Sequence, residues 1–250
     1  MKKNFLVFGF VGLSLISILF FVVSQNSTNI QQKGILTLTF DDGLKSQYEI
    51  AFKEMQKEGI KGTLFLLADW QGLFEGRELM SFAEAKEMQK EGWEIGSHTL
   101  DHLSLTILSE EEMKEELEKS KAILENKGFE IKTIAFPFGS YNENVIKETK
   151  KHYLASRQME DGFNSIENPN FYDLKSKWVM KKYSSDEVCS WIEKANEEGR
   201  WLILDFHNIG EEQTPWDFSE QKFKEVLECI KNEEIEVKTI KEVLEDEKRN

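Results

Sequence analysis

The stretch ILTLTFDDG, residues 35–43, decides how this chain folds. Its first six residues are apolar or β-branched, a composition that favours a short buried strand. Asp41 and Asp42 follow at the end of that strand, and Gly43 permits the backbone to turn there. Similar apolar runs recur along the chain, and each is followed by a segment with helical periodicity. The stretch is therefore the first of several strand–helix units.

Strand–helix alternation continues from residue 35 to the end of the chain. Strand-like runs cover residues 35–40, 62–67, 93–97, 131–136, 153–157, 177–181, 201–206 and 235–237. Helical patterns cover residues 47–58, 81–91, 109–126, 142–151, 185–198 and 218–232, and a terminal helix follows. Such alternation implies parallel strands joined by crossover helices. We predict an α/β fold, a distorted (β/α) barrel of about seven parallel strands, in preference to a doubly wound sheet.

Length and composition indicate a single domain after an N-terminal hydrophobic segment. The chain has 250 residues, is 40% hydrophobic and contains 3 prolines, so it can bury one sizeable core and has no Pro-rich linker. The formal net charge of −14 argues against nucleic acid as a partner. We expect residues 35–250 to form the domain and residues 26–34 to be a short linker.

The first 25 residues differ in composition from the rest. Lys2 and Lys3 precede an uncharged apolar run over residues 5–23, a pattern typical of an export signal. The run is also just long enough for a membrane-spanning helix, which needs about 20 residues. Residues 1–25 are therefore predicted to be either a cleaved signal peptide or an uncleaved membrane anchor. Both place the globular part outside the cytoplasm.

Two cysteines, Cys189 and Cys229, lie in amphipathic helical patterns. Buried thiols are the simplest interpretation, and a disulfide is compatible with an oxidising compartment. Two cysteines are too few for a zinc-finger framework.

Three of the four histidines stand at or just beyond the carboxyl ends of predicted strands. His98 and His102 are four positions apart, which on a helical turn brings both imidazoles within reach of one ion. Asp42 would add a carboxylate, because active-site residues of β/α barrels gather where the strands end. Two imidazoles and one carboxylate suit zinc, cobalt or another divalent first-row metal. The histidine spacing by itself is a weak signal.

Two other kinds of hydrolase fit these residues less well. A metalloprotease would need a glutamate directly after His98, where the chain has Thr99. A glycosidase would need two carboxyls that flank the scissile bond, but neighbouring residues on a strand point to opposite faces. Asp41 fits better as a base beside the metal that Asp42 binds.

Four motifs together resemble those of the polysaccharide deacetylases, the NodB-homology family. They occur in the family's order and are TFDDG at 39–43, HTLDH at 98–102, FPFG at 136–139 and LILDFH at 202–207. The resemblance extends from about residue 35 to about residue 244. It implies a metal-dependent hydrolase that removes N-acetyl groups from a polysaccharide such as peptidoglycan, a chitin-like oligomer or a poly-N-acetylglucosamine-type glycan.

The resemblance also implies roles for individual residues. It assigns the metal to Asp42, His98 and His102, general base to Asp41, general acid to His207, and substrate contact to Pro137 and Phe138, the latter offering its backbone N–H to the oxyanion. Trp70 and Trp216, in predicted loops, are further candidates for stacking on a sugar ring.

The chain departs from the family pattern beside the third motif. Many members carry an arginine two residues before the motif's proline, where it orients the base, and here that residue is Ala135. A carboxylate base needs a positive or hydrogen-bonding partner. Arg157, at the end of the fifth predicted strand, should open on the same face and hold Asp41 with its planar fork. An arginine that only pairs with surface acids is the alternative.

Two other functions use the same fold. An O-acetyl polysaccharide esterase would need the same residues, and a non-catalytic glycan-binding module would retain the fold without them. Every metal ligand and the base are present here, which favours an enzyme.

Overall fold

The computed structural model describes residues 32–69 and 71–249. The predicted signal or anchor over residues 1–25 and the candidate sugar-stacking residue Trp70 lie outside the described residues. Within the described ranges, none of the helices combines the length and the apolar character needed to cross a bilayer.

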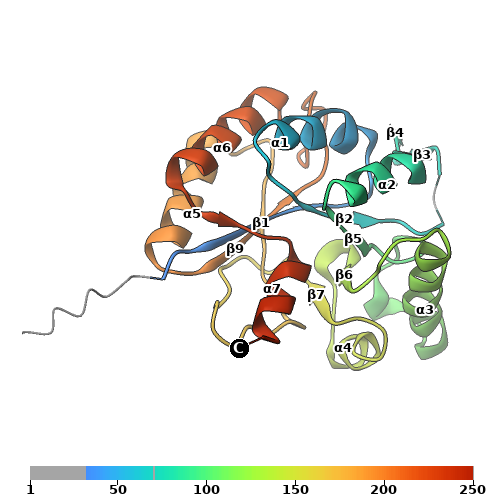
Figure 1. The fold of residues 1–250 in the computed structure, drawn as a ribbon. Coiled ribbons are helices and arrows are strands. Elements are labelled where there is room, and N and C mark those ends of the chain that lie inside the picture. The colour runs from blue at the N-terminus through green and yellow to red at the C-terminus, as the bar shows by residue number, and fades with distance from the viewer. Residues whose placement is uncertain (1–31, 70, 250) are drawn as a thin grey trace, which may run out of the picture. The chain divides into compact units, whose positions relative to one another are not determined.

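A curved, parallel sheet forms the centre of the domain that the structure describes (Figure 1). Its eight strands run in the order β7-β6-β5-β2-β1-β9-β8, and β10 pairs with β1 as well. Every pairing in this sheet is parallel. The predicted barrel-like α/β fold is confirmed. The strands are β1 (Ile35–Phe40), β2 (Thr63–Leu66), β5 (Glu94–Ser97), β6 (Thr133–Ala135), β7 (Ala155–Arg157), β8 (Lys177–Trp178), β9 (Trp201–Phe206) and β10 (Glu236–Val237).

Strand β1 is the central element of the sheet. One edge pairs with β9 along its whole length, from Ile35 opposite Trp201 to Phe40 opposite Phe206. The other edge is shared, because β10 pairs with its first two residues and β2 with its last two. All of β1 is buried, which explains its continuous run of apolar and β-branched residues. The residues that follow β1 are thereby fixed at the centre of the sheet's carboxyl edge.

The two ends of the sheet approach each other near Leu174. Arg157 of β7 forms an isolated parallel bridge with Leu174, and β8 begins three residues later and pairs with β9. This link curls the sheet towards a barrel. β8 is shorter than the predicted strand over residues 177–181: Val179 N–H still bonds Asp205 O, but Lys181 N–H bonds Pro215 O, outside the sheet.

Helices surround the sheet, and most of them begin with a capped first turn (Figure 1). Capping boxes start α2, α3, α5 and α7, where a serine or threonine and the glutamate three residues later satisfy free N–H groups. The predicted first helix is a π-helical segment, η1 (Gln47–Phe52), continued by α1 (Lys53–Lys57). The others are α2 (Phe82–Lys90), η2 (Leu105–Ile107), α3 (Glu110–Asn126), η3 (Pro137–Gly139), α4 (Glu143–Thr149), α5 (Ser185–Glu197), α6 (Glu220–Glu233) and α7 (Ile240–Glu247).

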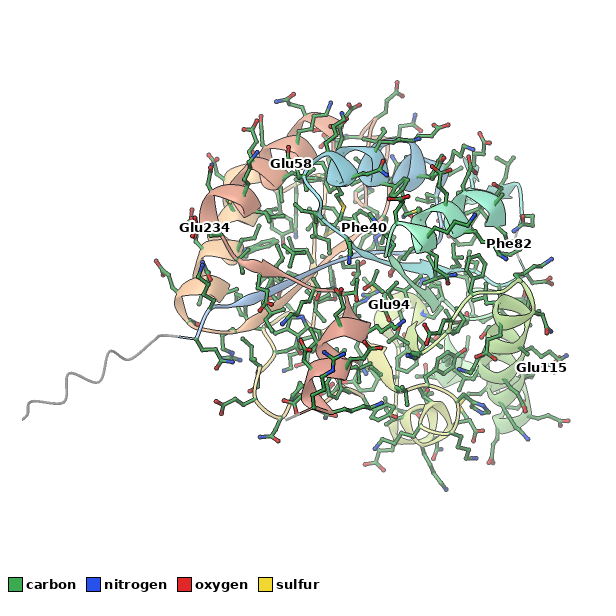
Figure 2. All side chains as sticks on the ribbon, viewed as in Figure 1. Phe40, Glu58, Phe82, Glu94, Glu115 and Glu234 are labelled. Carbon is green, nitrogen blue, oxygen red and sulfur yellow. The ribbon has the colours of Figure 1, made fainter. Side chains whose placement is uncertain are left out.

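The side chains divide between core and solvent as the periodicity requires. Phe40 is fully buried between sheet and helices, whereas Glu115 and Glu234 point outward (Figure 2). Cys189 in α5 and Cys229 in α6 are half-buried and free. The sequence prediction lacked the short helices η2 and η3 and an antiparallel hairpin of β3 (Leu73–Phe74) and β4 (Arg77–Glu78) between β2 and α2. Its turn, Glu75-Gly76, has φ values of 49° and 80°, as a tight two-residue hairpin turn requires.

Candidate metal and catalytic centre

The carboxyl ends of the strands surround a cavity of about 360 Å³. Asp41 and Asp42 enter it from the end of β1, His98 and His102 from beyond β5, and His207 from beyond β9. The parallel sheet thus brings together residues that lie up to 166 positions apart, from Asp41 to His207. Phe74, Phe138, Met159, Trp178 and Trp216 complete much of the wall.

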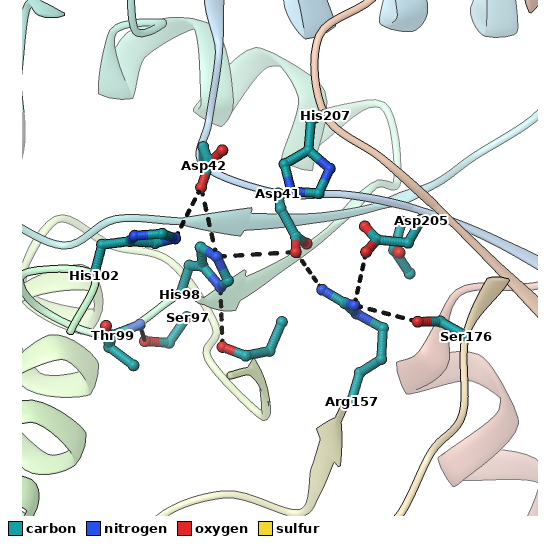
Figure 3. Close-up of polar contacts among 12 residues, drawn as sticks. Asp41, Asp42, Ser97, His98, Thr99, His102, Arg157, Ser176, Asp205 and His207 are labelled. Atoms are coloured by element: carbon teal, nitrogen blue, oxygen red, sulfur yellow. Dashed lines mark hydrogen bonds and ion pairs between the residues drawn. The ribbon is translucent and has the colours of Figure 1, made fainter. Parts of the chain in front are cut away.

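Asp42, His98 and His102 form a compact set of metal-ligand donors (Figure 3). Oδ1 of Asp42 lies 3.5 Å from Nε2 of each histidine, and the three donor atoms lie within 4.8 Å of one another. Such separations suit metal–ligand bonds of about 2 Å. The same Oδ1 is buried and accepts no hydrogen bond from the described residues. An unpaired buried carboxylate oxygen is costly, so the site fits a cation.

Both histidines are prepared to act as neutral ligands. Nδ1 of His98 lies 2.9 Å from the carbonyl oxygen of Ala135, which can only accept, so Nδ1 carries the proton and Nε2 keeps a lone pair for the ion. Burial lowers the pKa of His98 to about 4 and that of His102 to about 3. Burial raises the pKa of Asp42 to about 7. Each shift comes mainly from the removal of water around the charged form.

The two histidines do not lie on a helical turn, so that part of the spacing prediction is wrong. Residues 98–104 form a loop, and His102 reaches the site with a left-handed backbone at φ 55°. The Glu116 carboxylate of α3 fixes this loop by accepting the N–H groups of Leu100 at 2.9 Å and Asp101 at 3.1 Å. Asp42 and Phe138 are also left-handed, at φ 73° and 58°. Such strain is typical of functional sites.

Arg157 lies buried between two carboxylates. Its Nη2 donates to Asp41 Oδ2, while Nη1 donates to Asp205 Oδ2 at 2.9 Å and to Ser176 Oγ at 3.4 Å (Figure 3). The Phe65 ring lies under the guanidinium, 5.4 Å away. Burial alone would raise the pKa of Asp41, but Arg157 and the nearby histidines hold that pKa below its usual value. The guanidinium therefore keeps Asp41 ionised and fixes one of its two oxygens.

Asp205 is a site residue that the sequence analysis missed. We expected both terminal nitrogens of the Arg157 guanidinium to bind Asp41. Instead, Nη2 donates to Asp41 and Nη1 donates to Asp205. Asp205 belongs to β9 and is fully buried. The one available signal is a single acidic residue within the otherwise apolar run WLILDF.

Of the remaining predicted residues that the structure describes, Phe138, His207 and Trp216 line the cavity, whereas Pro137 does not. The His207 ring contacts the Trp216 ring, with centroids 5.5 Å apart. Gln47 connects the backbones of Asp41 and His207, because its Nε2 donates to Asp41 O at 2.5 Å and to His207 O at 2.9 Å. Pro137 is buried, whereas the Phe138 side chain is exposed and packs edge-on against His102 at 4.8 Å.

Comparison with known proteins agrees with this geometry. The family model for polysaccharide deacetylase matches residues 28–156. YxkH of Bacillus subtilis, which is named as a polysaccharide deacetylase, is 34% identical over 115 residues, 46% of this chain and 40% of its own. Peptidoglycan-N-acetylglucosamine deacetylase PgdA of Listeria monocytogenes is 30% identical over 115 residues, 45% of this chain and 23% of its own. The matches therefore span less than half of these curated relatives.

A solved structure extends the likeness to most of the fold. The Xyl-CE4 domain of a multidomain xylanase from the hindgut metagenome of Trinervitermes trinervoides superposes with a TM-score of 0.62 at 20% identity, over 86% of this chain and 92% of that domain. The matched family model covers more than half of the 250 residues. The chain therefore belongs to the polysaccharide deacetylase family.

Proposed function

We propose that the protein is a metal-dependent hydrolase that removes N-acetyl groups from a polysaccharide. The observation that carries this proposal is the donor set of Asp42, His98 and His102 next to Asp41, a carboxylate held ionised by Arg157. The names of relatives support the substrate class. They include peptidoglycan-N-acetylglucosamine deacetylases and a poly-beta-1,6-N-acetyl-D-glucosamine N-deacetylase of Staphylococcus aureus.

Asp42, His98 and His102 would hold a divalent ion, with zinc the first choice and cobalt or another first-row metal the alternative. When bound there, the ion polarises the acetyl carbonyl and lowers the pKa of a water molecule.

Asp41 is the proposed general base. Its Oδ2 is occupied by Arg157, whereas its buried Oδ1 accepts no hydrogen bond from the described residues and is available for a proton. Asp41 would take that proton from the attacking water, a step for which a positioned carboxylate contributes about 10²–10⁴-fold. The remaining hydroxide forms the new bond to the acetyl carbon.

His207 and Phe138 complete the proposed reaction. The backbone N–H of Phe138 would donate to the oxygen on which negative charge develops. His207, which also lines the cavity, would give a proton to the leaving amine as the carbon–nitrogen bond breaks. Acetate and the free amino sugar are the products. The rings of Phe74, Phe138 and Trp216 line the cavity and would exclude water from it.

We also propose that the protein acts outside the cytoplasm, where polymers of this kind are found. The segment over residues 5–23 would either be removed or anchor the domain to the membrane. Residues 26–34 would serve as the linker, and residues 35–250 as the deacetylase domain.

The deciding experiment measures acetate release from a panel of acetylated glycans with and without chelator. Release from chitooligosaccharide, peptidoglycan or poly-N-acetylglucosamine that stops on chelation supports the proposal. The panel includes acetylated xylan, because the Xyl-CE4 domain of a multidomain xylanase shares the fold. Release from xylan alone would instead identify an O-acetyl esterase, and binding without release from any glycan would identify a non-catalytic module.

A further inference from the structure

Two loops face each other across the end of β1. The β3–β4 hairpin follows β2, and the segment over residues 208–218 follows β9. β2 and β9 are the neighbours of β1 at its carboxyl end, so the two loops flank Asp41 and Asp42. The hairpin contributes Phe74 to the cavity, and the segment contributes Trp216.

Arg77 of β4 joins the two loops through Asp217. Arg77 Nη2 lies 2.7 Å from Asp217 Oδ1 and 2.9 Å from Oδ2, and it also donates to Thr214 Oγ1 at 2.9 Å. The Asp217 side chain is 0% exposed, against 23% for that of Arg77. The Asp217 carboxylate also accepts the backbone N–H groups of Gln213 at 2.7 Å and Thr214 at 2.6 Å. The buried Asp217 carboxylate therefore binds both the backbone of its own loop, at residues 213–214, and Arg77 of the β3–β4 hairpin.

Both loops are also attached to the chain that follows the two aspartates. Met80 N–H donates to Gly43 O at 2.9 Å, beside the hairpin. On the other side, Ser46 Oγ and Asn208 Oδ1 are 2.8 Å apart, and Ile209 N–H donates to Ser46 Oγ at 3.3 Å. The hairpin, residues 43–46 and residues 208–218 thus form one continuous wall beside the cavity, closed by the Arg77–Asp217 pair.

The wall sets the position of two aromatic rings relative to two site histidines. The Phe74 ring packs edge-on against the His102 ring at 4.9 Å, and the Trp216 ring lies 5.5 Å from that of His207. A sugar ring with apolar C–H faces is the kind of ligand that such aromatic surfaces bind. The distance between the rings must match the width of that sugar.

We propose that Arg77 is a positioning residue for the glycan. By pairing with Asp217 and Thr214, it fixes the separation of the Phe74 and Trp216 rings between which the acetylated sugar binds. The inference rests on the proposed deacetylase function. The proposed role of Arg77 predicts different effects on two classes of substrate. An oligosaccharide contacts both the Phe74 and Trp216 rings, whereas a small acetyl ester needs only the groups that carry out the reaction.

The test compares Arg77→Gln with wild type in the full-length, metal-loaded protein, using N-acetylglucosamine tetramer and 4-nitrophenyl acetate. KM for the tetramer should rise by about tenfold, the usual scale for a lost charge-assisted hydrogen bond, while kcat stays within about threefold. Hydrolysis of 4-nitrophenyl acetate should not change. Amide hydrogen exchange should accelerate in residues 72–80 and 208–218 only, because the ties between these loops loosen.

Arg200→Gln is the matched control. Arg200 is also partly buried and donates to the carbonyl oxygens of Phe163 and Asn164, but it precedes β9 and lies at the opposite end of the strand from the cavity. Its loss should leave both KM values unchanged.

The outcomes separate this inference from the function on which it rests. Absence of acetate release by wild type would refute the proposed function. Turnover by wild type with an unchanged tetramer KM in Arg77→Gln, or an equal loss on both substrates, would overturn the positioning role. If Arg77→Gln does not fold, Thr214→Val decides, because it removes the hydroxyl that accepts from Arg77, donates to Asp217 Oδ1 at 3.0 Å and accepts the Trp216 N–H at 3.3 Å, and so loosens the same tie. A KM rise of about threefold would support the inference, and an unchanged KM would overturn it.

Discussion

Replacing Arg157 by methionine removes the cation that two buried carboxylates share. The side chains of Arg157, Asp41 and Asp205 are 0%, 3% and 0% exposed, so water cannot replace the lost charge. Removal of one partner from a buried ion pair costs about 3–5 kcal/mol. For a protein of this size each kcal/mol corresponds to about 2–4 °C, so the melting temperature should fall by about 6–20 °C.

Turnover by the Arg157→Met protein should fall by about 10²-fold, since Asp41, the proposed base, loses the group that orients it. Metal content should not change, because Arg157 contacts none of the three proposed ligands. Circular dichroism melting, acetate release and elemental analysis of the purified protein measure the three quantities. Arg157→Lys keeps the charge without the fork and should recover only part of the stability. A melting temperature within 2 °C of wild type, together with normal turnover, would refute this reasoning.

Three other predictions concern the metal, the two aspartates and a remote carboxylate. Chelation should abolish acetate release, and zinc or cobalt ions should restore it. Full activity of metal-free protein would contradict the proposal that Asp42, His98 and His102 hold a required metal ion. Asp42→Ala should lose metal, whereas Asp41→Asn should keep metal and lose turnover by about 10²-fold or more, and equal metal loss in both would show that the roles are reversed. Burial raises the pKa of the Glu94 carboxyl group in the folded protein. The stability that this group contributes is therefore complete below its pKa in the unfolded chain and is lost as the pH rises through its pKa in the folded protein. The free energy of unfolding, measured with urea between about pH 4 and pH 8, should not show this loss in Glu94→Gln. The same pH dependence in wild type and Glu94→Gln would contradict the prediction.

The sequence was sufficient for the sheet and for most of the site. Buried parallel strands are continuous apolar runs, and their carboxyl ends meet at one edge, so Asp41, His98 and His207 could be placed together. The β3–β4 hairpin has two residues in each strand, too few to show an alternating pattern. Asp205 and the Arg77–Asp217 pair depend on contacts between residues 48 to 140 positions apart, which no local pattern reports.

The pairing of β1 also determines when the domain can be completed during synthesis. The Thr39 hydroxyl bonds the carbonyl of Leu204, 165 residues later, and β10 is made later still. At a ribosomal rate of about 5–20 residues per second, the edge of β1 that pairs with β9 waits roughly 8–33 s for its partner. An unpaired apolar strand is a template for aggregation, so a chaperone that holds the nascent chain would benefit this protein. A fragment that stopped at residue 156, where the family match ends, would never cover that edge.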